Sequence, residues 1–197
     1  ANILRELGYD DRIVELGAIT GWIHDIGNAV NRKNHGLSGA ALAFPLLTRM
    51  KMDMREIALI LGAIGNHEEE TGIPVSEISA ALIIADKSDA HRSRVRKKSF
   101  DYTDIHDRVN MSIKKNSLVV DREKHIIRLV IFMDETSALM EYLQIYLSRM
   151  ILSEKAAAFL GCSFELVING AVINRHTGVA KKMTLKSSEK EVSEEGN

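Results

Sequence analysis

Apolar residues recur at helical spacing through most of the first half of the chain. One such stretch runs from Ile13 to Ile23, directly after Asp10 and Asp11, either of which can cap a helix through its carboxylate. Gly27 is a residue type that commonly ends helices, so we expect this helix to end there.

The same spacing predicts three further helices before residue 98. They are expected over residues 37–50, 54–67 and 76–96, with a turn over residues 71–74 between the last two. Pro45 should kink or interrupt the first of these three, because proline lacks the backbone N–H that a helix interior uses.

The pattern changes beyond residue 98, where β-branched residues become frequent. A hairpin is predicted over residues 116–133 with its polar turn at 121–124, followed by an amphipathic helix over 135–160. Further strands are predicted over residues 164–169 and 171–174, on either side of a glycine.

These elements predict a mainly α fold with a small C-terminal appendage. We expect a helical domain over residues 1–112, a β-β-α-β (α/β) appendage over residues 113–180 and a disordered tail over residues 181–197. The appendage carries no cluster of metal-ligating or catalytic residue types, so we expect it to serve regulation or homodimer formation rather than chemistry.

Composition narrows the function classes. The chain has 197 residues and a formal net charge of −1, and this lack of basic excess argues against nucleic acid as a partner. The single cysteine, Cys162, excludes an internal disulfide framework. No long apolar span or signal-like start is present, so we expect a cytoplasmic protein with no membrane partner.

Five candidate metal ligands each lie beside an apolar, helix-like stretch: His24, Asp25, His35, His67 and Asp86. Imidazole nitrogen suits transition metals, a carboxylate can bridge two cations, and a set without thiolates favours hydrolysis. Each member also has a plainer interpretation. His24 and Asp25 can be a helix-end pair satisfied by backbone groups, and His35 can be a solvated loop residue.

His67 can likewise be a helix C-terminal histidine favoured by the helix dipole, although the three following glutamates oppose that role. Asp86 ends an apolar run, and a carboxylate at the edge of a buried stripe needs a partner or a cation. It is the strongest candidate after the His24–Asp25 pair.

In this order the motifs resemble the HD superfamily of metal-dependent phosphohydrolases, over roughly residues 1–98. LGAITGWIHDIGN is similar to the segment that carries the family's His-Asp pair, and ALIIADKSDAHR to its later Ala-Asp motif. NHGLSGAALA and ILGAIGNHEE are similar to the additional histidine motifs of the branch that binds two metals. The family carries one more metal-binding histidine upstream, and we expect the residues bearing it to precede Ala1.

The resemblance implies an HD-type helical bundle that binds one or two divalent ions, from among Mn, Fe, Co, Ni, Mg and Zn. It implies that Asp25 is catalytic and bridges two ions, with His24 and Asp86 completing one site and His35 and His67 the other. It also makes Arg92 the main substrate-binding residue, with Asn28, Lys33 and Lys87 as further candidates. The basic run after Asp86 can equally be a solvated helix face.

The leading hypothesis is therefore a metal-dependent phosphohydrolase acting on a nucleotide or another small phosphorylated substrate through metal-activated water. One alternative is a module that binds a nucleotide or metal for regulation without turnover. Another is a structural helical domain whose histidines bind nothing.

Overall fold

A computed structural model describes residues 1–92, 101 and 103–174 of the chain. Its N-terminal half contains the helices α1 (Asn2–Leu7), α2 (Asp11–Ile23), α3 (His35–Arg49), α4 (Met54–Gly65) and α5 (Glu77–Lys87), with the 3₁₀ turn η1 (Ile26–Ala29) between α2 and α3. A further helix, α6 (Ile105–Ser112), leads into the sheet.

Side-chain caps explain where several of these helices begin. Asp10, Asp53 and Ser76 each accept a hydrogen bond from a backbone N–H in the first turn of α2, α4 and α5. The predicted starts of these three helices are thus confirmed. Pro45 lies inside α3 without interrupting it.

Two helices end earlier than predicted. α2 stops at Ile23, so that His24 caps it and Asp25 precedes η1, and Gly27 is buried within η1 rather than serving as the cap. α5 stops at Lys87 instead of continuing toward residue 96. The cause at α5 is tertiary: the Asn116 amide donates to the backbone oxygens of Ser88 and Ala90, drawing the chain toward the sheet.

The C-terminal half forms a four-stranded mixed sheet in the order β1-β2-β3-β4. The strands are β1 (Ile113–Asp121), β2 (Ile126–Met133), β3 (Ser163–Ile168) and β4 (Ala171–Val172). β1 and β2 form the predicted antiparallel hairpin, whereas β2 and β3 are parallel and are joined by the long helix α7 (Leu139–Phe159). The short β4 turns back on β3 around Gly170.

The prediction of a mainly α fold is wrong. The described residues form seven α-helices together with this mixed sheet, which makes the fold helix-rich with a substantial β component. The sheet is more than an appendage because Ile127, Leu129 and Ile131 of β2 are fully buried in the same core as the N-terminal helices. The proposed domain boundary at residues 112 and 113 coincides with the start of β1 and stays a prediction.

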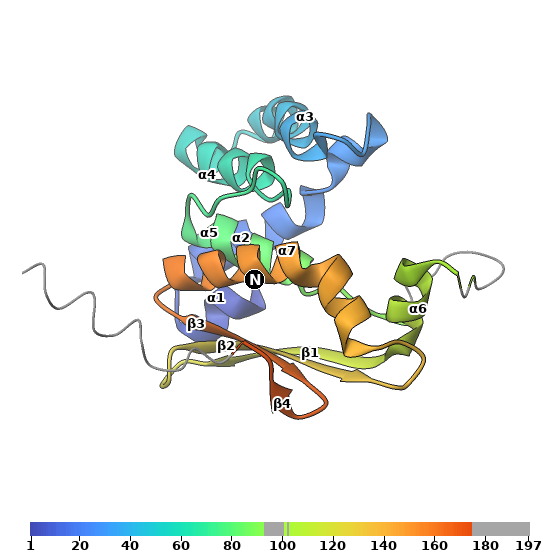
Figure 1. The fold of residues 1–197 in the computed structure, drawn as a ribbon. Coiled ribbons are helices and arrows are strands. Elements are labelled where there is room, and N and C mark those ends of the chain that lie inside the picture. Colours follow the sequence, from blue (N-terminus) through green and yellow to red (C-terminus); the bar gives the residue numbers. More distant parts are fainter. Residues whose placement is uncertain (93–100, 102, 175–197) are drawn as a thin grey trace, which may run out of the picture.

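Figure 1 shows the sheet along one side of the molecule, with α1, α2, α5 and α7 beside it and α3 and α4 farthest from it. α7 packs against both α5 and β3, so it joins the two halves of the chain. The predicted disordered tail lies outside the described residues. In the part of the chain that the structure describes, no helix has the length and apolar character to cross a membrane.

Candidate metal centre

The five candidate ligands come from the ends of four helices. His24 caps the C-terminus of α2 and Asp25 follows it, while His35 is the first residue of α3. His67 follows the end of α4, and Asp86 lies in the last turn of α5. Each of the five has a side-chain atom within 3.9 Å of another member of the set.

A close approach of η1 to α3 places the first two ligands beside the third. A Cβ atom on Gly27 would lie 2.0 Å from the backbone oxygen of His35, far inside van der Waals contact. Only glycine permits this approach, which brings Asp25 Oδ1 to 3.2 Å from His35 Nε2.

All three imidazoles share one local arrangement. Each Nδ1 lies within 2.9 Å of the backbone carbonyl oxygen three residues earlier, in the pairs His24–Gly21, His35–Arg32 and His67–Ile64. A carbonyl oxygen only accepts hydrogen bonds, so Nδ1 carries a proton, and in the neutral imidazole Nε2 then keeps its lone pair. Metal-binding histidines are typically oriented by such a second contact.

Each of the three Nε2 atoms lies within 3.9 Å of an oxygen of the Asp25 carboxylate. His35 Nε2 and His67 Nε2 are 3.0 Å apart, and His67 Nε2 lies 3.9 Å from Asp25 Oδ1. On the other side, His24 Nε2 lies 3.6 Å from Asp25 Oδ2 and 3.8 Å from Asp86 Oδ1. The two carboxylate oxygens of Asp25 therefore face different imidazoles.

This donor set fits a metal ion. The Nε2 atoms of His35 and His67 are 3.0 Å apart, and with both imidazoles neutral and protonated at Nδ1 their lone pairs would face each other, an arrangement that a cation between them would relieve. Nitrogen ligands at about 2.1 Å from one ion and at right angles to each other are about 3 Å apart. One ligand atom each of His24, Asp25 and His67 lies within 4.8 Å of the other two, so these residues could hold a metal ion.

Burial and neighbouring charges shift the pKa values of three candidate ligands, and only the shifts at His67 and Asp86 favour the forms that bind a metal. Burial lowers the pKa of His67, which favours the neutral imidazole that metals bind. Burial opposes ionisation of Asp86, but the His24 imidazole and the Lys87 ammonium outweigh it and hold the pKa of Asp86 well below its ordinary value. The Asp86 carboxylate in turn raises the pKa of His24.

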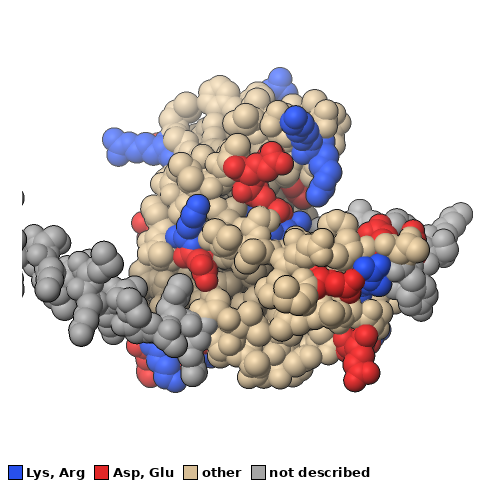
Figure 2. All heavy atoms as spheres, in the orientation of Figure 1, with Lys and Arg blue, Asp and Glu red and all other residues tan. Residues whose placement is uncertain are grey.

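Four of the five candidate ligands, His24, Asp25, His35 and Asp86, line one part of an open cleft of about 1490 Å³, and His67 is fully buried. Figure 2 shows acidic and basic side chains gathered between the α3–α4 layer and α7. Four cationic side chains and six carboxylates line the cleft: Arg32, Lys33, Lys87 and Arg149, with Asp25, Glu68, Glu69, Glu70, Asp86 and Asp89.

Three of the four predicted substrate-binding residues line the cleft, and the fourth does not. Asn28, Lys33 and Lys87 line the cleft, and the Lys87 ammonium bonds Asp86 Oδ2 at 2.6 Å. Arg92 is exposed and is absent from the cleft lining, because α5 ends at Lys87 and the chain turns away toward the sheet. Its role in substrate binding stays a prediction.

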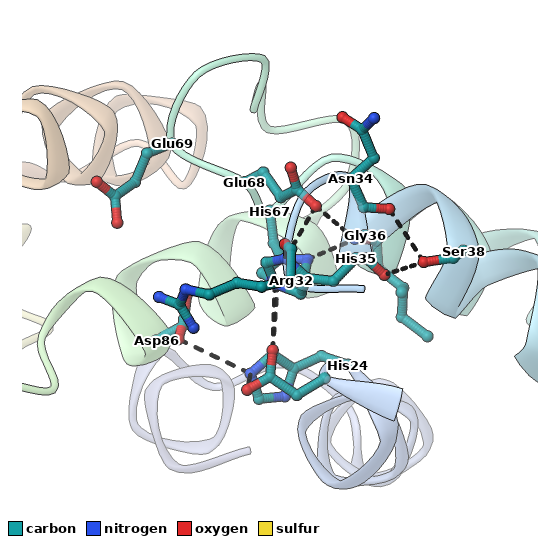
Figure 3. Close-up of polar contacts among 12 residues, drawn as sticks. His24, Arg32, Asn34, His35, Gly36, Ser38, His67, Glu68, Glu69 and Asp86 are labelled. Atoms are coloured by element: carbon teal, nitrogen blue, oxygen red, sulfur yellow. Dashed lines mark hydrogen bonds and ion pairs between the residues drawn. The ribbon is translucent and has the colours of Figure 1, made fainter. Parts of the chain in front are cut away.

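Several residues of the cleft were not predicted from the sequence, among them Glu68, Arg32 and Arg149. Glu68 contacts His35 Nδ1 at 3.0 Å and the backbone N–H of Gly36 at 2.6 Å, and its position directly after His67 was the signal for it. The side chain of Arg32 extends across the cleft in Figure 3, beside the predicted Lys33. Arg149 comes from α7, and no local pattern indicated it.

Comparison of the chain with protein-family models, curated proteins and solved structures gives no match.

Proposed function

We propose that this protein is a divalent-metal-dependent phosphohydrolase of the HD type. The observation that carries the proposal is the shared orientation of the three imidazoles, whose Nδ1 atoms face backbone carbonyl oxygens and whose Nε2 atoms converge on Asp25. The motif resemblance over residues 1–98 supports the same conclusion.

The contacts suggest two neighbouring ion positions. His35, His67 and Asp25 Oδ1 would hold one ion, and His24, Asp86 and Asp25 Oδ2 would contribute to the other. Bound Mn, Fe, Co, Ni, Mg or Zn would supply a nucleophilic hydroxide from water and polarise the phosphoryl group. Glu68 would keep His35 oriented through its contact with Nδ1.

The charge of the cleft supports a metal-dependent mode of phosphate binding. Carboxylates outnumber cationic side chains in the lining, so the protein alone repels an anionic substrate. One or two divalent ions would neutralise or reverse this excess. Lys33 and Arg32 would then bind phosphate oxygens, while Lys87 would hold Asp86 in position through its 2.6 Å hydrogen bond.

Metal analysis of the purified full-length protein tests the ligand set. We expect one to two transition-metal ions per chain, and a loss toward one ion in His35→Ala because that substitution removes a ligand from one position only. Asp25→Asn should reduce occupancy further, because Asp25 faces both positions. His106→Ala is the matched control, since His106 is exposed on α6 and is absent from the cleft lining.

A substrate panel tests the reaction. Nucleotides and generic phosphate esters should be hydrolysed by the metal-loaded protein, a chelator should abolish turnover, and Mn or Co should restore it. Tight nucleotide binding without turnover on a broad panel would instead identify a regulatory binding module. Equal metal content in folded Asp25→Asn and unaltered protein would refute the centre itself.

A further inference from the structure

A cationic side chain from the C-terminal half reaches the cleft. Arg149 lies on α7 and lines the same cleft as His24 and Asp86, although α7 carries none of the candidate metal ligands. Its side chain is only 16% exposed, so the guanidinium is held within the wall of the cleft.

Two contacts fix the plane of this guanidinium. Its Nε lies 2.7 Å from Glu69 Oε1, and its Cζ lies 5.0 Å from the centre of the Tyr146 ring. Ser148 donates a 3.3 Å hydrogen bond to the other oxygen of Glu69, which orients that carboxylate. Within the described residues the two Nη groups make no hydrogen bond, so the forked edge that binds phosphate bidentately is available.

A row of alternating charges connects Arg149 to the candidate metal centre. Asp86 bonds Lys87, whose ammonium lies 4.0 Å from Glu69 Oε1, and that oxygen contacts Arg149. Figure 3 shows the Glu69 carboxylate turned away from the imidazoles, on the side of α7. Arg149 therefore lies beyond the ligands themselves, farther along the cleft.

We propose that Arg149 binds a second anionic group of the substrate, next to the phosphoryl group held at the metal centre. The substrate class is then a compound with two neighbouring phosphoryl groups, such as a nucleoside diphosphate or triphosphate. The cleft of about 1490 Å³ exceeds what a single phosphate needs and leaves room for such a compound. The placement of the first group rests on the proposed function.

Binding of inorganic probes to the metal-loaded full-length chain tests this proposal. Calorimetry with orthophosphate and with pyrophosphate compares one phosphoryl group with two. In Arg149→Met the Kd of pyrophosphate should rise about tenfold or more, as expected for loss of a charged hydrogen-bonding partner, while that of orthophosphate changes less than about twofold. Arg149→Lys keeps the positive charge but loses the forked guanidinium, so its Kd for pyrophosphate should lie between those of the unaltered protein and Arg149→Met.

Arg128→Met is the matched control. Arg128 forms the same kind of pair, Nε to Glu165 Oε2 at 2.7 Å, but between strands β2 and β3 and outside the cleft lining. Arg128→Met should leave the Kd values of orthophosphate and pyrophosphate unchanged. Metal content and circular dichroism verify each variant, and Arg149→Lys alone decides the outcome if Arg149→Met does not fold.

Three results would overturn the proposal: an unchanged affinity for pyrophosphate in the Arg149 variants, an equal loss for both probes, or no pyrophosphate binding to the unaltered protein. Because binding is measured without turnover, the two proposals fail separately. A chain that binds pyrophosphate through Arg149 but hydrolyses no phosphate compound contradicts the hydrolase and leaves the anion site standing.

Discussion

At the scale of single residues, the backbone decides where the site imidazoles point. The residue types and their order are visible in the sequence, and the five candidate ligands indeed lie together. The orientation of each ring depends on a carbonyl oxygen at a helix end or in a turn, which the sequence does not reveal. The position of Arg149 in the cleft could not be predicted from the sequence either, because it depends on how α7 packs against the N-terminal helices.

Gly27 provides a residue-scale prediction. Gly27→Ala places a methyl group 2.0 Å from the His35 backbone oxygen, so η1 and α3 must separate and Asp25 must move away from His35. We expect metal occupancy to fall and the free energy of unfolding to decrease by several kcal/mol, about 2–4, as for severe overpacking. Metal analysis and urea unfolding measure the two effects.

Gly62→Ala is the control for this substitution. Gly62 lies within α4, where, among the described residues, an added Cβ would meet only Val75 at an ordinary 3.5 Å. Alanine there should raise helix stability by about 0.5–1 kcal/mol and leave metal content unchanged. Equal behaviour of the two variants would show that the close approach of η1 to α3 does not position the ligands.

At the scale of elements, the starts of the helices that a side chain caps could be predicted, whereas the ends of α2 and α5 could not. Starts depend on local caps such as Asp10 and Ser76, which precede apolar periodicity in the sequence. Ends depend on distant partners: Asn116, far along the chain in β1, holds the backbone at the end of α5. The early end of α5 is also why Arg92 is absent from the cleft.

The contact between α5 and α7 gives an element-scale prediction. Ser79 of α5 and Ser153 of α7 are buried, and within the described residues their hydroxyl oxygens have no hydrogen-bond partner. Burying such a hydroxyl costs free energy, so Ser153→Ala should leave stability unchanged or raise it by up to about 1 kcal/mol.

Ser112→Ala should change the free energy of unfolding in the opposite direction from Ser153→Ala. Ser112 is also fully buried, but its hydroxyl donates a 2.7 Å hydrogen bond to the Val109 backbone oxygen. Its loss should destabilise the protein by about 0.5–1.5 kcal/mol in urea unfolding. A destabilising Ser153→Ala of the same size would mean that the Ser153 hydroxyl has a partner after all, such as a buried water.

At the scale of the whole molecule, the order of the C-terminal elements could be predicted from the sequence. That the sheet and the N-terminal helices form one hydrophobic core could not. The hairpin, the long helix and the strands around Gly170 all lie where the pattern predicted them. The sequence did not indicate that β2 and β3 pair in parallel, nor that α7 then packs on α5. Those long-range contacts make the sheet part of one core, which is why a mainly α fold was the wrong expectation.

Hydrogen exchange tests the connection between the site and the whole fold. The ligands lie at the ends of α2, α3, α4 and α5, and helix ends open at lower free energy than helix centres. Adding Mn²⁺ to metal-free protein should slow amide exchange around residues 22–36, 64–68 and 84–87 and leave the β1–β2 hairpin unchanged. Equal slowing of the sheet, or none at the helix ends, would contradict a bound ion at this position.

Ligands at helix ends have a further consequence for how the chain is held together. An ion bound by residues 24, 25, 35, 67 and 86 would close successive loops of the chain, as a disulfide does, in a protein whose single cysteine cannot form one within the chain. Unlike a covalent crosslink, this one has a strength that depends on ion concentration. Metal supply, rather than oxidation, would then determine how firmly the N-terminal helices are joined.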